Sequence, residues 1–284
     1  MFLEKHFARR KAVKFAPMRS LIVVLTCLIA GSASPAAGAA CPDVKRERVE
    51  VVSVGDRLDI LLADGRLIAF PALEPPRASP AEPERVRTTT AQVQALLQGK
   101  IVFLQPLGAA DRWGRVPARL FLPDQDEPVD ELLLGAGLAM RGAGAAPCED
   151  DARAAENAAR DAALGLWADP AFAVLAADRP QDFAGRDGVL AVVEGRIASI
   201  GRTPPRTYLN FGAWGGFHAS IAKRNWPAFE RAGFSEANLR AGKLRLRGIV
   251  DLERGPHMEL FHPEQIEFMD EPPRDAAKAS DRKF

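Results

Sequence analysis

Short stretches of alternating apolar and polar residues recur between Val49 and Leu122. A period of two predicts strands that bury one face. Two longer segments, which stop at Gly99 and Gly165, predict helices because glycine commonly follows a helix end. The predicted strands are 49–54, 57–62, 67–72, 101–105 and 116–122, and the predicted helices are 84–97, 131–138 and 150–164.

Turn residues separate these predicted strands. Asp64-Gly65 is typical of a tight hairpin, and residues 111–115 (DRWGR) predict an exposed turn between the last two strands. Five prolines between Pro71 and Pro83 predict an irregular loop over 73–83. Several short strands with a few helices favour a mainly β (α+β) fold whose first unit is a small OB-like barrel followed by helices.

A second set of alternating stretches covers 183–270, and we predict for it a second OB-like barrel in tandem with the first. The alternation over 243–250 places Lys243, Arg245 and Arg247 on one strand face. The polar tail 271–284 is predicted to be loose. The other predicted strands of this unit are 188–199, 207–212 and 258–261, with short helices at 226–231 and 236–239.

The first 40 residues have the pattern of a secretory signal. Basic residues precede the apolar run 21–30, and a small-residue stretch follows it. The run is about half of the ~20 residues that a spanning helix needs. We therefore predict a signal peptide over 1–40 and an exported, periplasmic or secreted protein without stable membrane insertion after cleavage. Met18 is an alternative start.

Cysteine usage agrees with export. Cys41 and Cys148 remain after the signal is removed, and two thiols in an exported chain predict one disulfide. The alternatives are two free thiols, or a lipoprotein in which Cys41 is lipidated.

Length and charge limit the functions that the chain can have. Its 284 residues predict two domains, and a hydrophobic fraction of 47% excludes global disorder. Residues 1–40 contain six of the 38 basic residues and one of the 37 acidic residues, which leaves the remainder with four more acidic than basic residues. Any nucleic acid must therefore bind to a local patch.

Five segments, in order and at similar spacing, resemble the staphylococcal nuclease (thermonuclease) family over about 49–170. They are VGDRL at 54–58, QGKIV at 98–102, DRWGR at 111–115, GLA at 137–139 and ALGLW at 163–167. The resemblance implies a nuclease-like OB domain over 45–170 with C-terminal helices. It also implies calcium-dependent hydrolysis of phosphodiester bonds in DNA or RNA.

The resemblance assigns functional roles to two residues of this chain, and at three other functional positions of the family this chain has a different residue type. Asp56 falls on a calcium-binding carboxylate, and Arg115 falls on an arginine that stabilises charge on phosphorus; pairing with Asp111 or Asp124 is the simpler alternative for Arg115. The family's other arginine, second metal acid and general base are replaced by Ile68, Leu73 and Pro76. Leucine has no oxygen for calcium and proline has no side-chain base.

These losses lead to two hypotheses. The first is a degenerate nuclease fold that binds nucleic acid or an interaction partner, without Ca²⁺. The second is an active calcium-dependent endonuclease whose site is rebuilt with Glu74 as a ligand or base beside Asp56 and Arg115. A structural role in the cell envelope is a third alternative, and the sequence identifies no protein partner.

Other candidate contact residues lie outside this set. A fold-level similarity to nucleic-acid-binding OB barrels makes Tyr208, Lys243, Arg245 and Arg247 candidates for bases and phosphates, with an ordinary solvated strand face as the alternative. Trp113 is expected to be a turn aromatic or a packing residue, with base stacking as the alternative. The spacing of His218, His257 and His262 matches no metal site, so satisfied or exposed histidines are expected.

Overall fold

The computed structural model describes residues 45–75, 83–144, 149–212 and 215–270. All of them belong to one compact unit, Ala36–Phe284. The predicted signal peptide, the Cys41–Cys148 disulfide, Pro76 and the tail 271–284 lie outside the described residues and stay predictions. Within the described part, the helices are all too short or too polar to cross a membrane.

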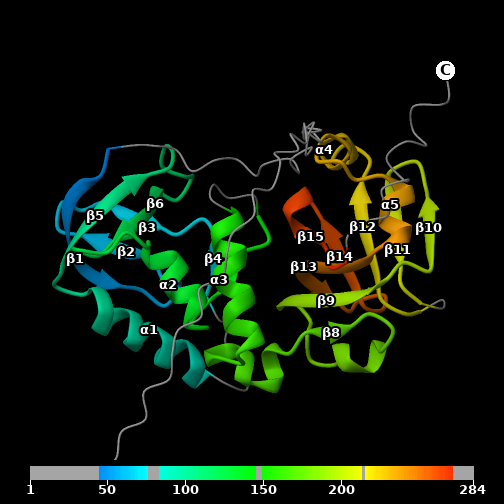
Figure 1. The fold of residues 1–284 in the computed structure, drawn as a ribbon, viewed down its shortest axis with the longest axis horizontal. Helices are drawn as coiled ribbons and strands as arrows, with labels where there is room; N and C mark the ends of the chain where they lie inside the picture. Colours follow the sequence, from blue (N-terminus) through cyan, green and yellow to red (C-terminus); the bar gives the residue numbers. More distant parts are fainter. Residues whose placement is uncertain (1–44, 76–82, 145–148, 213–214, 271–284) are drawn as a thin grey trace, which may run out of the picture. The chain divides into compact units, whose positions relative to one another are not determined.

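Five strands form a closed barrel in the order β1-β2-β3-β6-β5 (Figure 1). Strands β3 and β6 pair in parallel, and the other neighbours pair antiparallel. The predicted small OB-like barrel is confirmed at this level of detail, because the sheet closes on itself within the first unit. The strands are β1 (Glu47–Val54), β2 (Ile60–Leu62), β3 (Leu67–Ala69), β5 (Ile101–Pro106) and β6 (Arg115–Phe121).

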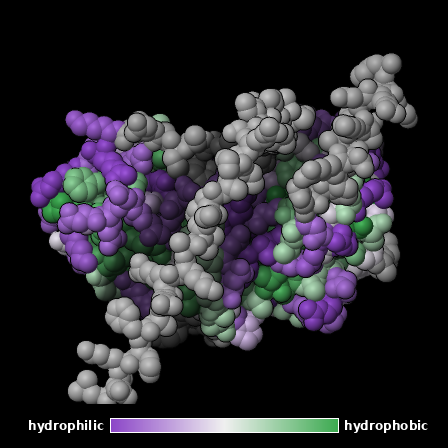
Figure 2. Space-filling view, viewed as in Figure 1, coloured by the Kyte–Doolittle hydropathy of each residue, from purple (hydrophilic) through white to green (hydrophobic). Residues whose placement is uncertain are grey.

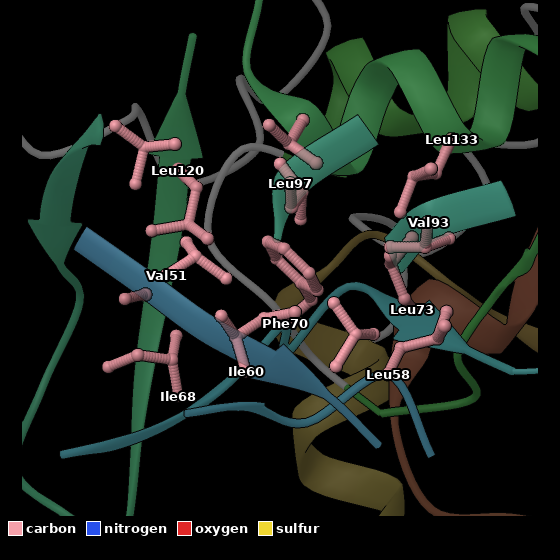
Figure 3. Close-up of a cluster of buried hydrophobic side chains, with 14 of the residues drawn as sticks. Val51, Leu58, Ile60, Ile68, Phe70, Leu73, Val93, Leu97, Leu120 and Leu133 are labelled. Atoms are coloured by element: carbon pink, nitrogen blue, oxygen red, sulfur yellow. The ribbon is translucent and has the colours of Figure 1, made fainter. Parts of the chain in front are cut away.

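Helices α1 (Pro83–Leu97) and α2 (Val129–Gly135) supply side chains to the barrel core. Figure 3 shows Val93, Leu97 and Leu133 from these helices beside apolar side chains of the strands. Helix α1 ends where Gly99 adopts a left-handed φ of +72°, and the Gly99 N–H donates to the Val51 carbonyl at 2.8 Å. This turn joins α1 to β1 and starts β5 in register.

The predicted loop 73–83 is partly wrong. Residues Leu73–Glu74 form the short strand β4, which pairs with β7 (Met140–Arg141). Proline excludes regular structure only where its missing N–H is needed, and the two residues before Pro75 are free to pair. This pairing fixes Glu74 at the edge of the barrel.

Helix α3 (Glu149–Asp161) is shorter than the predicted 150–164, because Ala163 and Gly165 have positive φ angles of 51° and 53°. The chain then enters a 3₁₀ turn, Gly165–Ala168, whose Leu166 N–H donates to the Gly137 carbonyl at 2.8 Å. Two of the sequence segments behind the nuclease resemblance, GLA at 137–139 and ALGLW at 163–167, therefore lie backbone to backbone.

The remaining strands form an eight-stranded mixed sheet with the order β10-β11-β12-β14-β13-β9-β8, in which β15 also pairs with β13 (Figure 1). Two short helices, α4 (Trp226–Arg231) and α5 (Glu236–Ala241), lie between β12 and β13 in the chain. A closed second barrel is not established by these pairings, so the tandem arrangement stays a prediction. The strands are β8 (Leu175–Ala176), β9 (Leu190–Arg196), β10 (Ser199–Arg202), β11 (Arg206–Asn210), β12 (His218–Ala222), β13 (Lys243–Asp251), β14 (His257–Leu260) and β15 (Ile266–Phe268).

Sequence patterning missed β8, β10, β12 and β15. Strand β12 reads HASIA. Its last four residues are buried, so both faces are covered, and the alternation that marks a half-buried strand is missing. The predicted strand 258–261 is observed as β14, and one more strand, β15, follows it.

Candidate functional site

A polar cavity of about 290 Å³ lies at one end of the barrel. The charged residues that line it are Arg57, Asp59, Glu74, Asp111 and Arg115. Three carboxylates against two guanidinium groups make the lining acidic. Apolar residues, among them Phe70 and Pro117, form the rest of its wall.

The turn between β1 and β2 places Asp59 in this cavity. The Leu58 N–H donates to the Gly55 carbonyl at 2.9 Å, and Leu58 is buried with a left-handed φ of +58°. Such a conformation costs roughly 1–2 kcal/mol for a residue with a side chain. The buried positions on either side, Leu58 and Ile60, face the core, so Asp59 faces the cavity.

The turn 111–115 is held by the Asp111 carboxylate. Its Oδ1 accepts the backbone N–H groups of Trp113 at 2.9 Å and Arg115 at 3.0 Å. Its Oδ2 accepts from Arg115 Nε at 2.9 Å, and Arg115 Nη1 donates to Asp59 Oδ1 at 3.2 Å. Although desolvation opposes it, these hydrogen bonds from Arg115 and Trp113 hold the pKa of Asp111 below its usual value.

Arg115 is therefore already neutralised. Two carboxylates share its guanidinium group, and their hydrogen bonds raise its pKa despite partial desolvation. The predicted pairing with Asp111 is confirmed, and Asp59 is an additional partner that sequence reasoning missed. The alternation of 58–60 is the signal that could have placed Asp59 away from the core.

Trp113 is the most exposed large hydrophobic residue in the described part of the chain, at 62%. The guanidinium carbon of Arg112 lies 3.9 Å from the centroid of its ring, and that of Arg115 lies 5.0 Å away. Arg115 also lines the cavity. The turn thus presents an exposed aromatic ring with two guanidinium groups near it, beside the cavity.

The residues assigned by the nuclease resemblance do not assemble as a set. Arg115 and Glu74 line the same cavity, whereas Asp56 is exposed in the turn and is not among the described residues of the lining. Ile68 and Leu73 belong to the barrel core, where Figure 3 shows them among other apolar side chains, and Leu73 also lines the cavity.

The implied calcium ion does not fit these residues. One of its two carboxylate positions, Leu73, is a core side chain with no oxygen, and the other, Asp56, lies outside the lining. No three His, Cys, Asp or Glu side chains within 45–75, 83–144, 149–212 and 215–270 are grouped so that they could hold a metal ion. These residues therefore do not provide the calcium site that the resemblance implies.

The predicted basic face of 243–250 is not a free surface. Leu244 and Leu246 are buried as predicted, but Lys243 and Arg245 both bind the Glu194 carboxylate, at 2.9 and 2.7 Å. Arg247 is only 2% exposed. The Lys243 side chain stays 41% exposed, but Arg245 and Arg247 are largely covered, so the three cations do not form one free basic surface.

Arg247 belongs to a buried ion cluster with Arg141 and Glu156. Arg247 Nη1 donates to Glu156 Oε1 at 3.0 Å and to the Arg141 carbonyl at 2.9 Å, and Nη2 also contacts the Glu156 carboxylate. The Arg141 backbone N–H donates to Glu156 Oε1 at 2.7 Å. This cluster joins β7 and α3 to β13.

Much of the molecular face seen in Figure 2 is hydrophilic. In Figure 2, hydrophobic residues of the viewed face appear in separate groups among hydrophilic ones. A large continuous apolar surface, the usual mark of a stable protein–protein interface, is not what this face presents.

A scan against protein-family models finds no match, and a search of the curated proteins finds none either. The class of protein therefore rests on the barrel and the residues around its cavity.

Proposed function

We propose that the protein is a thermonuclease-like domain protein that binds single-stranded nucleic acid at the turn 111–115, in a fold that no longer assembles its family's cleavage site. The observation that carries this proposal is the exposed Trp113 ring flanked by Arg112 and Arg115. Base–aromatic stacking next to cations is the usual way in which proteins hold single strands without sequence preference.

The charges around the cavity determine how a strand would lie. Three carboxylates repel phosphates from the cavity floor, and Arg115 is neutralised by two of them. Arg57 and Arg112 are exposed and make no ion pair with any residue of the described part. Phosphates would therefore contact these outer arginines, while a base stacks on Trp113.

The nuclease-like class itself is part of the proposal. It is supported by the closed five-stranded barrel, by the turn 111–115 at the cavity, and by the contact between Gly137 and Leu166. The apolar side chains of Ile68, in the core, and Leu73, at the cavity wall, support binding over cleavage, because the resemblance implies polar groups at both positions.

Replacing Trp113 with alanine is expected to weaken binding of a fluorescently labelled single-stranded oligonucleotide by about 5- to 100-fold, the usual effect of removing one stacked base contact. Trp113→Phe should keep most of the affinity because a ring remains. Fluorescence anisotropy at several salt concentrations measures both.

The matched control is Phe261→Ala, which truncates another exposed aromatic residue, the one directly after β14. It should leave the affinity unchanged.

Two phosphate contacts predict that log K falls with log salt with a slope of about −1.4. Equal binding by the wild type and Trp113→Ala would rule out the proposed surface.

Cleavage is the second candidate, and the position of Glu74 in the same cavity as Arg115 favours testing it. We expect no hydrolysis of single-stranded DNA, duplex DNA or RNA by the full chain, either with millimolar calcium or with chelator. Calcium-dependent cleavage that is lost in Glu74→Gln and kept in the exposed control Glu127→Gln would replace the binding proposal with a rebuilt endonuclease.

A further inference from the structure

The outer face of β10, β11, β12 and β14 carries a continuous set of polar side chains. Leu209, Ala219 and Met258 are fully buried in the core, so the residues next to them in each strand lie on the other face of the sheet, where Ser220 is also covered. One cross-strand row runs from Ser199 through Asn210 and His218 to His257. The next row contains Gly201, Tyr208, Ser220 and Glu259.

A cavity of about 510 Å³ lies over the first of these rows. Its polar lining consists of Ser199, Tyr208, Asn210, His218 and Arg254, and Gly212, Gly215 and Gly216 lie along its wall. This volume is within the range of small-ligand sites, about 300–1,000 Å³. The cavity is separate from the one beside Arg115.

The rings in this cavity are held in place by their neighbours on the same face of the sheet. His218 stacks on His257 with 4.8 Å between ring centroids, and the Tyr208 ring lies 6.1 Å from His218. His257 Nε2 lies 2.9 Å from Ser220 Oγ, which accepts a hydrogen bond from Arg206 Nη1 at 3.1 Å. The imidazole of His218 is therefore oriented before any ligand arrives.

The charges behind the cavity also favour a neutral His257. Burial lowers its pKa, and His218 and Arg206 act in the same direction, whereas Asp251 and Glu259 oppose them. A neutral ring stacks on His218 without like-charge repulsion.

The polar groups at the cavity are suited to a nucleobase edge and an anion. Asn210 Nδ2 donates to Ser199 Oγ at 3.1 Å, which orients the amide, and its side-chain oxygen is an acceptor for a donor of the ligand. Arg254 is exposed at the end of the row and makes no ion pair within the described part. One oriented amide, two rings and one unpaired cation match a base joined to a phosphate.

Two other uses of these residues do not fit. Ser220 is fully buried, so its hydroxyl group cannot reach a substrate as a nucleophile. His218 and His257 lack a third ligating side chain among the described residues.

We propose that this cavity binds a phosphorylated nucleoside unit, with the base against Tyr208 and His218, its edge at Asn210, and the phosphate at Arg254. The unit is either a free nucleoside monophosphate or the phosphorylated end of a strand. This site stands independently of the Trp113 surface.

Calorimetric titration of the full chain with AMP, adenosine and inorganic phosphate tests the proposal. AMP should bind once per chain and about tenfold or more tightly than adenosine or phosphate alone. Arg254→Ala should abolish the preference for AMP over adenosine, and Asn210→Ala should weaken both ligands. Arg224→Ala, at another exposed arginine, is the matched control and should bind AMP like the wild type.

Trp113→Ala should bind AMP normally, which separates this site from the proposed strand-binding turn. Tighter binding of a 5′-phosphorylated oligonucleotide than of AMP would identify a strand end as the source, and the reverse would identify the free nucleotide. Absence of AMP binding with intact circular dichroism would overturn the proposal, and so would equal binding of AMP and phosphate or an unchanged affinity in Arg254→Ala.

Discussion

Replacing Glu156 with glutamine is expected to lower the free energy of unfolding by about 3–5 kcal/mol, the usual cost of removing one partner from a buried ion pair. Glu156 is fully buried between Arg141 and Arg247, which are 0% and 2% exposed. Glutamine keeps the size and one acceptor oxygen, but its amide N–H groups would face the donors of Arg247. Arg247 would then lack its counter-charge, and Arg141 would keep only its ion pair with Glu267. Urea unfolding followed by circular dichroism measures the change.

The control for this variant is Glu127→Gln, the same substitution at an exposed carboxylate, which should change stability by about 0.5 kcal/mol or less. A stronger test replaces the whole cluster, as Arg141→Met, Glu156→Leu and Arg247→Met together. Apolar residues of similar size should recover much of the lost stability. A loss below about 1 kcal/mol in Glu156→Gln would contradict the cluster's importance.

Acid should remove the same contribution. Burial alone would raise the pKa of Glu156, but the charges of Arg247 and Arg141 outweigh it and hold the pKa below the ordinary value of 4.5. A carboxyl group with a lowered folded-state pKa contributes its full stability above its unfolded-state pKa and loses it as the pH falls. The difference in stability between the wild type and Glu156→Gln should therefore shrink below about pH 4.5. Arg141 stays charged throughout, since burial and Arg247 lower its pKa only to about 10.

Gly137→Ala is expected to cost about 3–5 kcal/mol, at the upper end of single substitutions. Gly137 has a φ of +66°, and a Cβ there would lie 2.2 Å from the Leu164 carbonyl oxygen. The opposing group is backbone, so no side-chain rotation relieves the overlap. The contact between the segments after α2 and α3 would have to open. Thermal and urea unfolding of the variant measure the loss.

Gly99→Ala separates backbone strain from the steric overlap. Gly99 has a similar φ of +72°, but no atom lies within 4 Å of its built Cβ. This control should cost only the roughly 1–2 kcal/mol of the left-handed conformation. Equal losses in the two variants would show that the close approach of Gly137 to Leu164 is not what the glycine is needed for.

Local patterning predicted the first barrel well, because most of its strands alternate between more and less buried residues, although residues 118–121 of β6 are all buried. Strands over 49–54, 101–105 and 116–122 are confirmed within one or two residues, and so is the helix that ends before Gly99. The same rule failed at β12, whose residues are mostly buried on both faces, and at β4, which is only two residues long. Such strands carry no period to detect.

The candidate site was predicted only in part. Arg115 and Glu74 do lie at one cavity, but Asp59 takes a place beside Arg115 that the resemblance did not give to any residue. The turn 55–58 decides this, because it directs Asp56 to solvent and Asp59 inward. Turn geometry of this kind depends on the left-handed backbone of Leu58, and a leucine gives no sequence signal for that conformation.

The sequence by itself determined the barrel class, the turn at 111–115 and the apolar side chains at Ile68 and Leu73, where the nuclease resemblance implies polar groups, because these follow from residue type and near neighbours. Tertiary structure alone decided which charges are free. Lys243, Arg245 and Arg247 alternate as an exposed basic strand would, yet Glu194 and Glu156, distant in sequence, neutralise them. Burial of a charge depends on what packs over it, and no local pattern records that.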